Sequence, residues 1–430
     1  MLDRLFALET FGIKLGLENI SRLCAALGHP ERSFTSLHIA GTNGKGSVTA
    51  MVHAALVAGG IRAARYVSPH LVELAERFVI GSDPVAAHAL EDAAHHVLDC
   101  ADRLRVAGEL AAHPTFFEAT TAIAFELFRR ARVEVAVVEV GLGGRFDSTN
   151  VVPASAGAIT SIGFDHQDLL GETLEAIAFE KAGIIKPGMP VVIGALPDQA
   201  RQVVAAAAAD RRAPLIDASA GTHMDRDVSE GRTIVALDTP DDRYGPLTLG
   251  LRGEHQVDNA LVAVRLLEAA RRYAGLHVSR DAIERGLAEV RWPGRLELIQ
   301  MPGAAHVLLD AAHNVDGARA LAAYLERWHP ERPVVVVGMM RDKDVAGIVD
   351  ALLPVVSSFI ATAASTPRAI PARELATRIA ARGASAVRAE PDPATAVEQA
   401  LSTTRSVCVT GSIFLIGAVR DRLRRRAILR

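Results

Sequence analysis

The sequence predicts an α/β protein with a parallel-sheet N-terminal domain of the phosphate-loop type and a smaller, Rossmann-like C-terminal domain. Three observations support this fold class. Apolar, β-branched runs alternate with amphipathic helical stretches almost throughout, which is typical of β-α-β units. At roughly 150 residues per domain, the chain of 430 residues provides for two or three domains. A Pro-Gly break near residue 293 separates two such alternating series.

The N-terminal series is expected to contain four early parallel strands. Each is a nearly continuous apolar run, as expected for strands covered on both faces, and is followed by Gly, Ser, Asp or Asn and a helical segment. We place these strands at residues 36–40, 63–67, 133–140 and 158–162. Residues 221–251 carry Asp, Thr and Gly among short alternating pieces, which predicts a small antiparallel flap.

The domain boundary is expected at Trp292-Pro293-Gly294-Arg295, after a predicted helix over residues 279–290. Pro and Gly end that helix, and a new alternating series follows. We therefore predict domains at residues 1–294 and 295–430. Strands of the second domain are expected near residues 307–310, 334–338, 359–363 and 407–410.

Charge and hydropathy exclude two classes of partner. Lys and Arg number 47 against 50 Asp and Glu, so the chain lacks the basic excess of a nucleic-acid binder. No charge-free stretch reaches the ~18–20 apolar residues of a membrane span. We therefore expect small-molecule partners, no nucleic acid, no membrane, and a monomer. The scattered Cys24, Cys100 and Cys408 form no paired motif and indicate a reducing, cytoplasmic location.

Lysine usage marks candidate functional positions. Five of the 47 basic residues are lysines: Lys14, Lys45, Lys181, Lys186 and Lys343. In so Arg-rich a sequence, a remaining lysine indicates a place where a planar, permanently charged guanidinium does not serve. Chance survival on the surface is the alternative.

A phosphate loop is predicted at residues 38–47, HIAGTNGKGS, between a strand and a helix at residues 48–58. Glycines let backbone N–H groups face a phosphate, the helix N-terminus adds positive potential, and Lys45 can reach the β- and γ-phosphates. The segment departs from the usual motif at Ile39 and at Gly46. A glycine-rich turn without a ligand is the alternative. We favour a nucleotide bound by Gly41, Thr42, Asn43, Gly44, Lys45, Gly46 and Ser47.

Three further strand ends carry side chains suited to a metal ion. Ser68 follows the second predicted strand, Glu139 lies near the end of the third, and His166 follows the fourth. Ligands of open parallel sheets collect beyond the carboxyl ends of the strands, where these residues would meet Lys45. Mg²⁺ bridging ATP phosphates prefers oxygen ligands, for which His is atypical. For Glu139 alone, a helix-capping carboxylate is the alternative.

Residues 180–186, EKAGIIK, hold two of the five lysines near the start of a predicted apolar strand. A lysine beside a metal can lose its proton and take up CO₂ as a carbamate, which supplies oxygen ligands, whereas arginine cannot. A solvated helix end is the alternative for Glu180 and Lys181. The residues alone leave both interpretations open.

Taken together, these motifs resemble the folylpolyglutamate synthase/dihydrofolate synthase family of the Mur ligase superfamily. The motifs are GTNGKGS at 41–47, SPH at 68–70, TFFE at 115–118, EVGLGGRFDSTN at 139–150, DH at 165–166, EKAGIIK at 180–186, HQVDN at 255–259, WPGR at 292–295 and DAAHN at 310–314. They follow the family order from Gly12 to Gly417, so the resemblance covers nearly the whole chain, and as a set they are highly specific.

The resemblance implies an ATP-dependent amide ligase that adds L-glutamate to dihydropteroate and/or (tetrahydro)folate polyglutamates. A substrate carboxylate attacks the γ-phosphate of ATP, which gives an acyl phosphate and ADP, and the amine of L-glutamate then displaces phosphate. Charge builds on phosphoryl oxygens, so Lys45 and Mg²⁺ would stabilise it. Two Mg²⁺ ions are implied, with a carbamylated Lys181 organising the second.

The resemblance also implies roles for particular residues of this sequence. Ser68, Glu139 and His166 would bind the first Mg²⁺. The nucleotide would further contact Gln256, Asn259, Arg295 and Asp310. The catalytic set would comprise Lys45, Lys181, His313 and Ser412, and the pterin pocket would comprise Arg77, Phe117, Asp147 and Ser148.

Two other function classes stay open at this point. A peptidoglycan-type Mur ligase would use an additional N-terminal domain for its UDP-sugar, and we expect none because the phosphate loop begins near residue 40. A nucleotide-binding regulator without ligase activity would not need Lys45, Glu139, His166 and Lys181 together.

Overall fold

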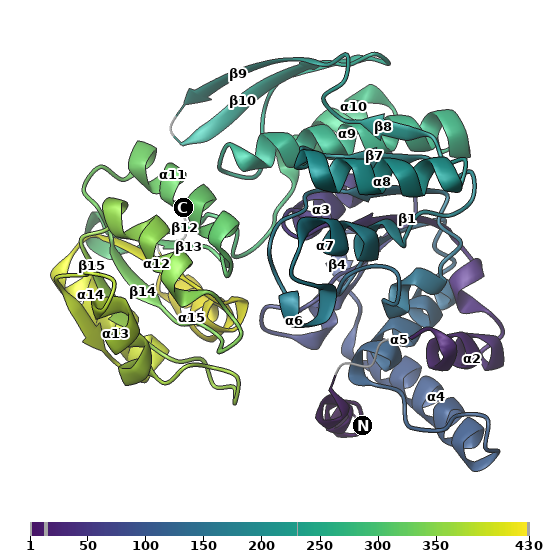
Figure 1. Ribbon diagram of the computed structural model, residues 1–430, viewed down its shortest axis with the longest axis horizontal. Coiled ribbons are helices and arrows are strands. Elements are labelled where there is room, and N and C mark those ends of the chain that lie inside the picture. Colours follow the sequence, from purple (N-terminus) through teal and green to yellow (C-terminus); the bar gives the residue numbers. More distant parts are fainter. Residues whose placement is uncertain (1, 13–15, 230, 428–430) are drawn as a thin grey trace. The chain divides into compact units, whose positions relative to one another are not determined.

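The computed structural model describes residues 2–12, 16–229 and 231–427, so Lys14 lies outside the described residues. The chain divides into two compact units (Figure 1). The first comprises Met1–Asp225, Val235–Leu247 and Asp258–Val290, and the second comprises Arg226–Ile234, Thr248–Val257 and Arg291–Arg430. The second unit thus includes two segments that precede the predicted boundary at residues 294–295.

The first unit is built on an eight-stranded sheet of order β4-β3-β2-β5-β1-β6-β7-β8. Its strands are β1 (Thr35–Ala40), β2 (Ala63–Tyr66), β3 (Phe78–Ile80), β4 (Asp83–Pro84), β5 (Val135–Glu139), β6 (Ala156–Ile159), β7 (Val191–Ile193) and β8 (Leu215–Asp217). The four predicted strands are confirmed as β1, β2, β5 and β6, which pair in parallel. The strands β3 and β4 form an antiparallel edge that the sequence analysis did not place.

Ten α-helices belong to this unit in the part of the chain that the structure describes. They are α1 (Leu2–Phe6), α2 (Glu18–Ala26), α3 (Lys45–Ala58), α4 (Ala87–Val106), α5 (Phe116–Arg130), α6 (Gln167–Leu170), α7 (Leu174–Ala182), α8 (Asp198–Asp210), α9 (His255–Ala274), which begins in the second unit, and α10 (Arg280–Glu289). Figure 1 shows α2, α4 and α5 side by side, and α10 packs on α3. The helices cover the apolar sheet, so every residue of β5 is buried.

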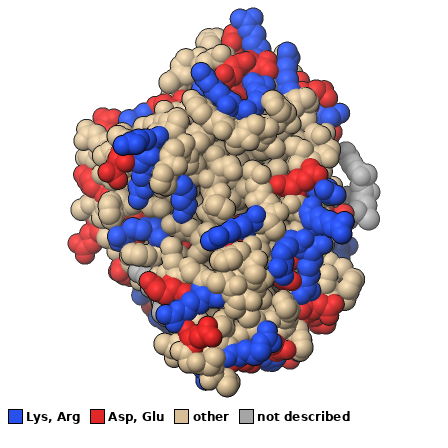
Figure 2. Space-filling model, turned by 90° about the vertical axis from the view of Figure 1, so that its right-hand side faces the viewer, with Lys and Arg blue, Asp and Glu red and all other residues tan. Residues whose placement is uncertain are grey.

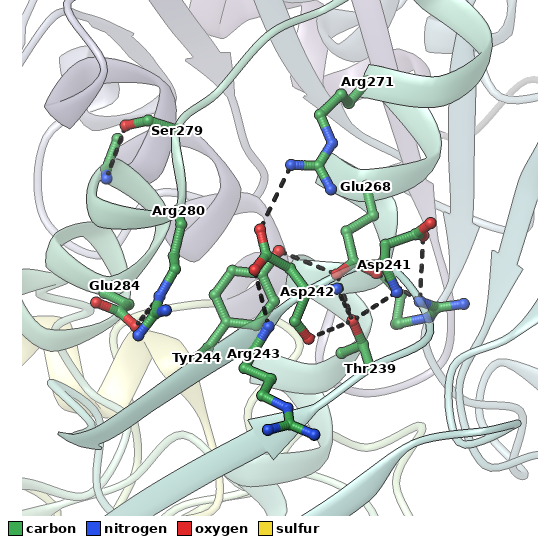
Figure 3. A network of polar contacts seen from close by, with 12 residues as sticks. Thr239, Asp241, Asp242, Arg243, Tyr244, Glu268, Arg271, Ser279, Arg280 and Glu284 are labelled. Atoms are coloured by element: carbon green, nitrogen blue, oxygen red, sulfur yellow. Dashed lines mark hydrogen bonds and ion pairs between the residues drawn. The ribbon is translucent and has the colours of Figure 1, made fainter.

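The predicted flap is a separate three-stranded sheet of β9 (His223–Ser229), β10 (Arg232–Asp238) and β11 (Arg243–Thr248). Its consecutive strands are joined by connections too short for a parallel crossover, so neighbouring strands run in opposite directions. A polar network holds the β10–β11 turn to α9 (Figure 3): buried Glu268 accepts hydrogen bonds from Thr239 at 2.6 Å and Tyr244 at 3.0 Å. The flap is therefore anchored through a carboxylate.

The second unit contains a six-stranded sheet of order β12-β13-β17-β14-β15-β16. Its strands are β12 (Glu297–Gln300), β13 (His306–Leu309), β14 (Val334–Val337), β15 (Ser358–Ala361), β16 (Val387–Ala389) and β17 (Ser406–Thr410). Its helices are α11 (Val315–Trp328), α12 (Val345–Leu352), α13 (Ala372–Ala380), α14 (Pro393–Thr403) and α15 (Ile413–Arg426). The four predicted strands are confirmed as β13, β14, β15 and β17, and β12 alone is antiparallel to its neighbour.

The molecular surface carries charges of both signs. On the face drawn in Figure 2, Lys and Arg side chains lie interspersed with Asp and Glu side chains. Within the described residues, no helix combines the length and apolar character that crossing a bilayer requires.

Candidate active site

The loop between β1 and α3 is held by the residues that follow β6, the neighbouring strand. The Asn43 carbonyl accepts hydrogen bonds from Thr160 Oγ1 at 2.6 Å and from Ser161 Oγ at 3.0 Å. The Thr42 N–H donates to the Ser161 carbonyl at 2.8 Å. Gly41 is required at this contact, because a Cβ there would lie 2.0 Å from Thr160 Oγ1. The end of β6 therefore fixes the shape of the predicted phosphate loop.

Helix α3 begins at Lys45, three residues earlier than predicted, directly after Gly44. Gly44 has a φ of 85°, and a Cβ there would lie 2.3 Å from Asn259 Oδ1. Asn259 of α9 thus packs directly against the loop, and its contact with a nucleotide stays a prediction. Gly46 and the buried Ser47 lie in the first turn of α3, whose backbone N–H groups have no partner within the helix. This helix start can therefore attract an anion.

Two lysines converge on one backbone oxygen of this loop. Lys45 Nζ donates to the Gly41 carbonyl at 2.9 Å and to the Thr42 carbonyl at 3.1 Å. Lys181 Nζ donates to the same Gly41 carbonyl at 2.9 Å. Burial and the charge of Lys45 lower the pKa of Lys181 to about 7, against the opposing effects of Asp165 and Asp147. The loop therefore combines a charged lysine with one that is readily deprotonated.

The position of Lys181 corrects two expectations. Lys181 lies in the last turn of α7, and β7 begins at Val191, so the expectation of a place near the start of a strand is wrong. Its side chain is buried, so the solvated helix end is also wrong. The preceding Glu180 is only partly buried and pairs with Arg145 at 2.6 Å. The two neighbours differ because α7 turns Lys181 toward the phosphate loop.

The three predicted metal ligands lie at or after the carboxyl ends of strands in one continuous part of the sheet, β2-β5-β1-β6. Glu139 ends β5, pairs in register with Ile39, and is 5% exposed. Ser68 follows β2 and is half-buried. His166 precedes α6, and its N–H donates to Asp165 Oδ1 at 3.0 Å. Because these strands are parallel, their carboxyl ends lie at the same edge of the sheet. All three residues therefore lie at the edge that carries the phosphate loop.

Two predicted pterin-pocket residues, Arg77 and Phe117, meet at Tyr66, the last residue of β2. The rings of Phe117 and Tyr66 stack with centroids 6.1 Å apart. Arg77 hydrogen-bonds to Tyr66 and donates Nε–H to His70 Nδ1 at 2.9 Å. Burial lowers the pKa of Arg77, whose charge also interacts with Glu139. One predicted pterin residue, Arg77, therefore interacts electrostatically with a predicted metal ligand.

Asp147 and Ser148 lie in the turn that follows β5. The Asp147 carboxylate accepts hydrogen bonds from the N–H groups of Leu142 at 2.8 Å and Thr149 at 3.0 Å. Burial raises the pKa of Asp147 against these hydrogen bonds. Ser148 is buried at the start of the short helix η4 (Ser148–Val151). Both residues shape the turn, and a pterin contact by either stays a prediction.

In the second unit, Asp310 joins two of the predicted motifs. Its Oδ2 accepts the N–H of Leu296 at 2.9 Å, and its Oδ1 accepts the N–H of Ala312 at 3.0 Å. The Ala311 N–H also donates to the Gly294 carbonyl at 2.8 Å. The carboxylate therefore fixes the WPGR segment against the DAAHN segment. The action of Asp310 on nucleotide phosphates stays a prediction.

His255, at the start of α9, contacts Gln256 and interacts electrostatically with Asp310 and Arg295. Gln256 Nε2 lies 3.2 Å from His255 Nε2. Burial lowers the pKa of His255, Asp310 raises it, and the charge of Arg295 lowers it further. Three of the four additional nucleotide residues thus gather in the second unit, whereas Asn259 belongs to the first.

His313 and Ser412 have local partners in the second unit. His313 Nδ1 lies 2.9 Å from the Ala311 carbonyl oxygen. Ser412 is buried as the N-cap of α15 and accepts the Phe414 N–H at 3.2 Å. These contacts orient both side chains, and their catalytic roles stay predictions.

Sequence reasoning missed four residues that contact the predicted site residues and help to position them. They are Thr160, Ser161, Tyr66 and His255. A weak signal existed for the first two, because hydroxyl residues directly follow the apolar run of β6. The TFFE motif carries a clearer signal, since Thr115 and Glu118 form a reciprocal capping box at the start of α5. That motif therefore has a structural explanation.

Comparison with known domains defines the class of protein. A model of the Mur ligase middle domain matches residues 85–267, and a model of the Mur ligase glutamate ligase domain matches residues 294–413. The chain therefore has the domain plan of a Mur-type ligase, as the fold and the loop lysine indicate.

Similarity to whole proteins defines the family. The chain is 33% identical to the dihydrofolate synthase/folylpolyglutamate synthase of Bacillus subtilis over 420 residues, which cover 96% of each chain. Folylpolyglutamate synthase of Mycobacterium tuberculosis, crystallised with ADP and AMPPCP, has 36% identity, a TM-score of 0.90 and 96% coverage of both chains. The bifunctional enzyme of Yersinia pestis, complexed with AMPPNP and a Mn ion, has 31% identity, a TM-score of 0.84, and coverage of 98% of this chain and 97% of that one. The chain belongs to the dihydrofolate synthase/folylpolyglutamate synthase family, whose members are ATP-dependent glutamate ligases.

Proposed function

We propose that this chain is an ATP-dependent amide ligase that joins L-glutamate to dihydropteroate and to (tetrahydro)folate polyglutamates. The observation that carries this proposal is the pair of lysines on the Gly41 carbonyl, at the start of a helix behind a glycine-rich loop. Such a loop binds nucleotide phosphates through N–H groups and a lysine charge. The relatives named for this reaction match nearly the whole chain.

The reaction proceeds in two steps, with an acyl phosphate as the intermediate between them. A carboxylate oxygen of the folate substrate attacks the γ-phosphorus of ATP, and the bond to the β-phosphate oxygen breaks to release ADP. The free amine of L-glutamate then attacks the acyl carbon, phosphate leaves, and the amine gives up a proton. Lys45 and the first turn of α3 stabilise the negative charge that develops on the phosphoryl oxygens.

Divalent metal fits the residues after β2, β5 and β6. Glu139 is a buried carboxylate at the sheet edge of the phosphate loop, which is the donor type that Mg²⁺ prefers. Ser68, Glu139 and His166 would hold one Mg²⁺, which would shield the phosphate charge. Lys181 as a carbamate would hold a second. Its lowered pKa supports this role, because the neutral amine is the form that reacts with CO₂.

The remaining predicted site residues would contact the pterin, the nucleotide and L-glutamate. Arg77 and Phe117, with Asp147 and Ser148 shaping the adjacent turn, would contact the pterin. Gln256, Asn259, Arg295 and Asp310 would contact the nucleotide. His313 and Ser412 would act on the incoming L-glutamate or the acyl phosphate. We propose further that the enzyme is a cytoplasmic monomer.

The test is turnover with ATP, L-glutamate and either dihydropteroate or tetrahydrofolate, measured as ADP release and as the glutamylated product. We expect ADP release to depend on both the pterin and L-glutamate. Substrate labelled with ¹⁸O in its carboxylate should transfer one label to phosphate, as an acyl phosphate requires. Turnover with a UDP-MurNAc-peptide instead would establish the peptidoglycan class. Nucleotide binding without turnover on any of these acceptors would establish the regulator.

A further inference from the structure

A cluster of two imidazoles and one carboxylate lies in the second unit, outside the proposed active site. His306 begins β13, His329 follows the end of α11, and Glu331 lies two residues further on. His306 Nε2 and His329 Nδ1 are 3.2 Å apart, His329 Nδ1 and Glu331 Oε1 are 3.2 Å apart, and His306 Nε2 and Glu331 Oε1 are 3.6 Å apart. The three donor atoms thus form a nearly equilateral triangle.

The size of this triangle matches one face of a tetrahedral metal site. Zinc binds imidazole nitrogen and carboxylate oxygen at about 2.0–2.2 Å, so neighbouring ligand atoms of a tetrahedral site are about 3.3–3.6 Å apart. The three observed separations lie at or close to this range. Two nitrogen donors with one oxygen donor favour a zinc-class ion over Mg²⁺ or Ca²⁺, which prefer oxygen.

The surroundings hold the two imidazoles in place and leave one side open. His306 pairs in register with Ser406 of β17, and Ser406 Oγ lies 3.0 Å from His306 Nε2. The His329 side chain is 8% exposed, and its ring packs against Tyr324 with centroids 5.8 Å apart. Glu331 is 44% exposed, which gives an ion a path from solvent. A rigid nitrogen pair and an accessible carboxylate are the parts of a pre-organised site.

We propose that His306, His329 and Glu331 bind one divalent transition-metal ion of the zinc class, with Ser406 or water at the fourth position. This site is independent of the proposed ligase function. His306 stands at the amino end of β13 and Asp310 follows its carboxyl end, so about 13 Å of strand separates them. The ion would join β13 to the end of α11 and thereby stabilise the second unit.

The test is a titration of the tag-free, chelator-dialysed full chain with Co²⁺, in the presence of excess Mg²⁺ to saturate oxygen-rich sites. We expect one Co²⁺ per chain, the visible absorption of tetrahedral cobalt, and displacement by Zn²⁺. Glu331→Gln and His306→Gln should weaken binding at least tenfold. The matched control is His223→Gln, because His223 is an exposed histidine beside Asp225 in the flap; this variant should bind as wild type does.

Folding of the variants is followed by circular dichroism and thermal unfolding. Zn²⁺ should raise the Tm of wild type and of His223→Gln, because an ion that binds the folded state stabilises it. It should leave the Tm of Glu331→Gln unchanged, and ligase turnover of that variant should match wild type. Absence of saturable Co²⁺ binding in wild type, or equal binding by Glu331→Gln and wild type, would overturn the proposal and leave the cluster as a hydrogen-bonded one.

Discussion

Glu268 and Lys181 are both buried ionisable residues of the first unit, but their surroundings differ. Glu268 accepts hydrogen bonds from Thr239 and Tyr244 (Figure 3). It also pairs with Arg265 at 2.5 Å. Lys181 donates to the Gly41 carbonyl, while Asp165 and Asp147 act on it through longer-range electrostatics. The charge of Glu268 has a directly paired arginine, whereas the carboxylates that act on Lys181 do so from farther away.

The difference separates a structural charge from a functional one. A buried carboxylate with three donors is stable where it stands and fixes the flap to α9. A buried lysine beside another lysine costs folding free energy, which indicates that its position serves chemistry. Substitutions at the two residues should therefore have opposite consequences for stability and activity.

The largest effect is expected from Lys181→Arg. A guanidinium cannot form a carbamate and would bring a permanent charge toward the phosphate loop, so turnover should fall by at least about a hundredfold. Steady-state ADP release at saturating substrates measures this loss. The matched control is Lys186→Arg, because Lys186 donates to Asn150 oxygens that a guanidinium can also reach. Full activity of Lys181→Arg would show that turnover does not need a carbamate at Lys181.

Lys181→Met should change how stability depends on pH. The pKa of Lys181 is about 7 in the folded state against an ordinary lysine value of 10.5, so wild type loses stability as the pH falls from about 10.5 to 7. Methionine removes the titrating group, and the variant should be more stable than wild type near pH 7, by at most about 5 kcal/mol. Urea unfolding of wild type and of Lys181→Met at pH 7 and pH 10 measures how the stability of each protein depends on pH. A variant less stable than wild type at pH 7 would contradict the cost of this buried charge.

Glu268→Gln should act in the opposite direction. It leaves the buried Arg265 without its closest countercharge and weakens the bonds to Thr239 and Tyr244, so the free energy of unfolding should fall by about 2 kcal/mol. Turnover at a temperature where the variant stays folded should match wild type. Urea unfolding combined with an ADP-release assay tests the pair of expectations. Unchanged stability with reduced turnover would place Glu268 among the functional residues.

The smallest effect is expected from Arg280→Ala, at the edge of the same network. Arg280 is half exposed and pairs with Glu284 one helical turn away, at 3.0 Å. Exposed pairs of this kind are screened by solvent and contribute little to stability. Glu284 also accepts the Gly245 N–H at 2.8 Å, a contact that does not involve Arg280. A clear fall in the urea midpoint of Arg280→Ala would show that the network is more cooperative than its geometry indicates.

The sequence predicts the parts of the fold that depend on local pattern. The runs that become β1, β5 and β6 are apolar enough to mark central strands, and GTNGKGS marks the phosphate loop by its own glycines and lysine. The strands β3 and β4 have three and two residues, so they carry no periodic signal.

The burial of Lys181 could not be predicted, because it depends on a carbonyl 140 residues away in the sequence. The same holds for Tyr66, whose partners Arg77 and Phe117 come from other elements. Long-range packing, rather than local propensity, places these supporting residues. The strand ends, by contrast, were predictable because a parallel sheet brings its carboxyl ends to one edge.

The central claim is that the loop at residues 41–47 binds the phosphates of ATP for glutamate ligation. Turnover of Lys45→Ala with ATP, L-glutamate and dihydropteroate, compared with wild type at equal folded fraction, tests it most directly. We expect a loss of at least about a hundredfold, because a preorganised charge at the phosphates is removed. Activity of Lys45→Ala within about threefold of wild type, less than about 1 kcal/mol of transition-state stabilisation, would contradict the assignment.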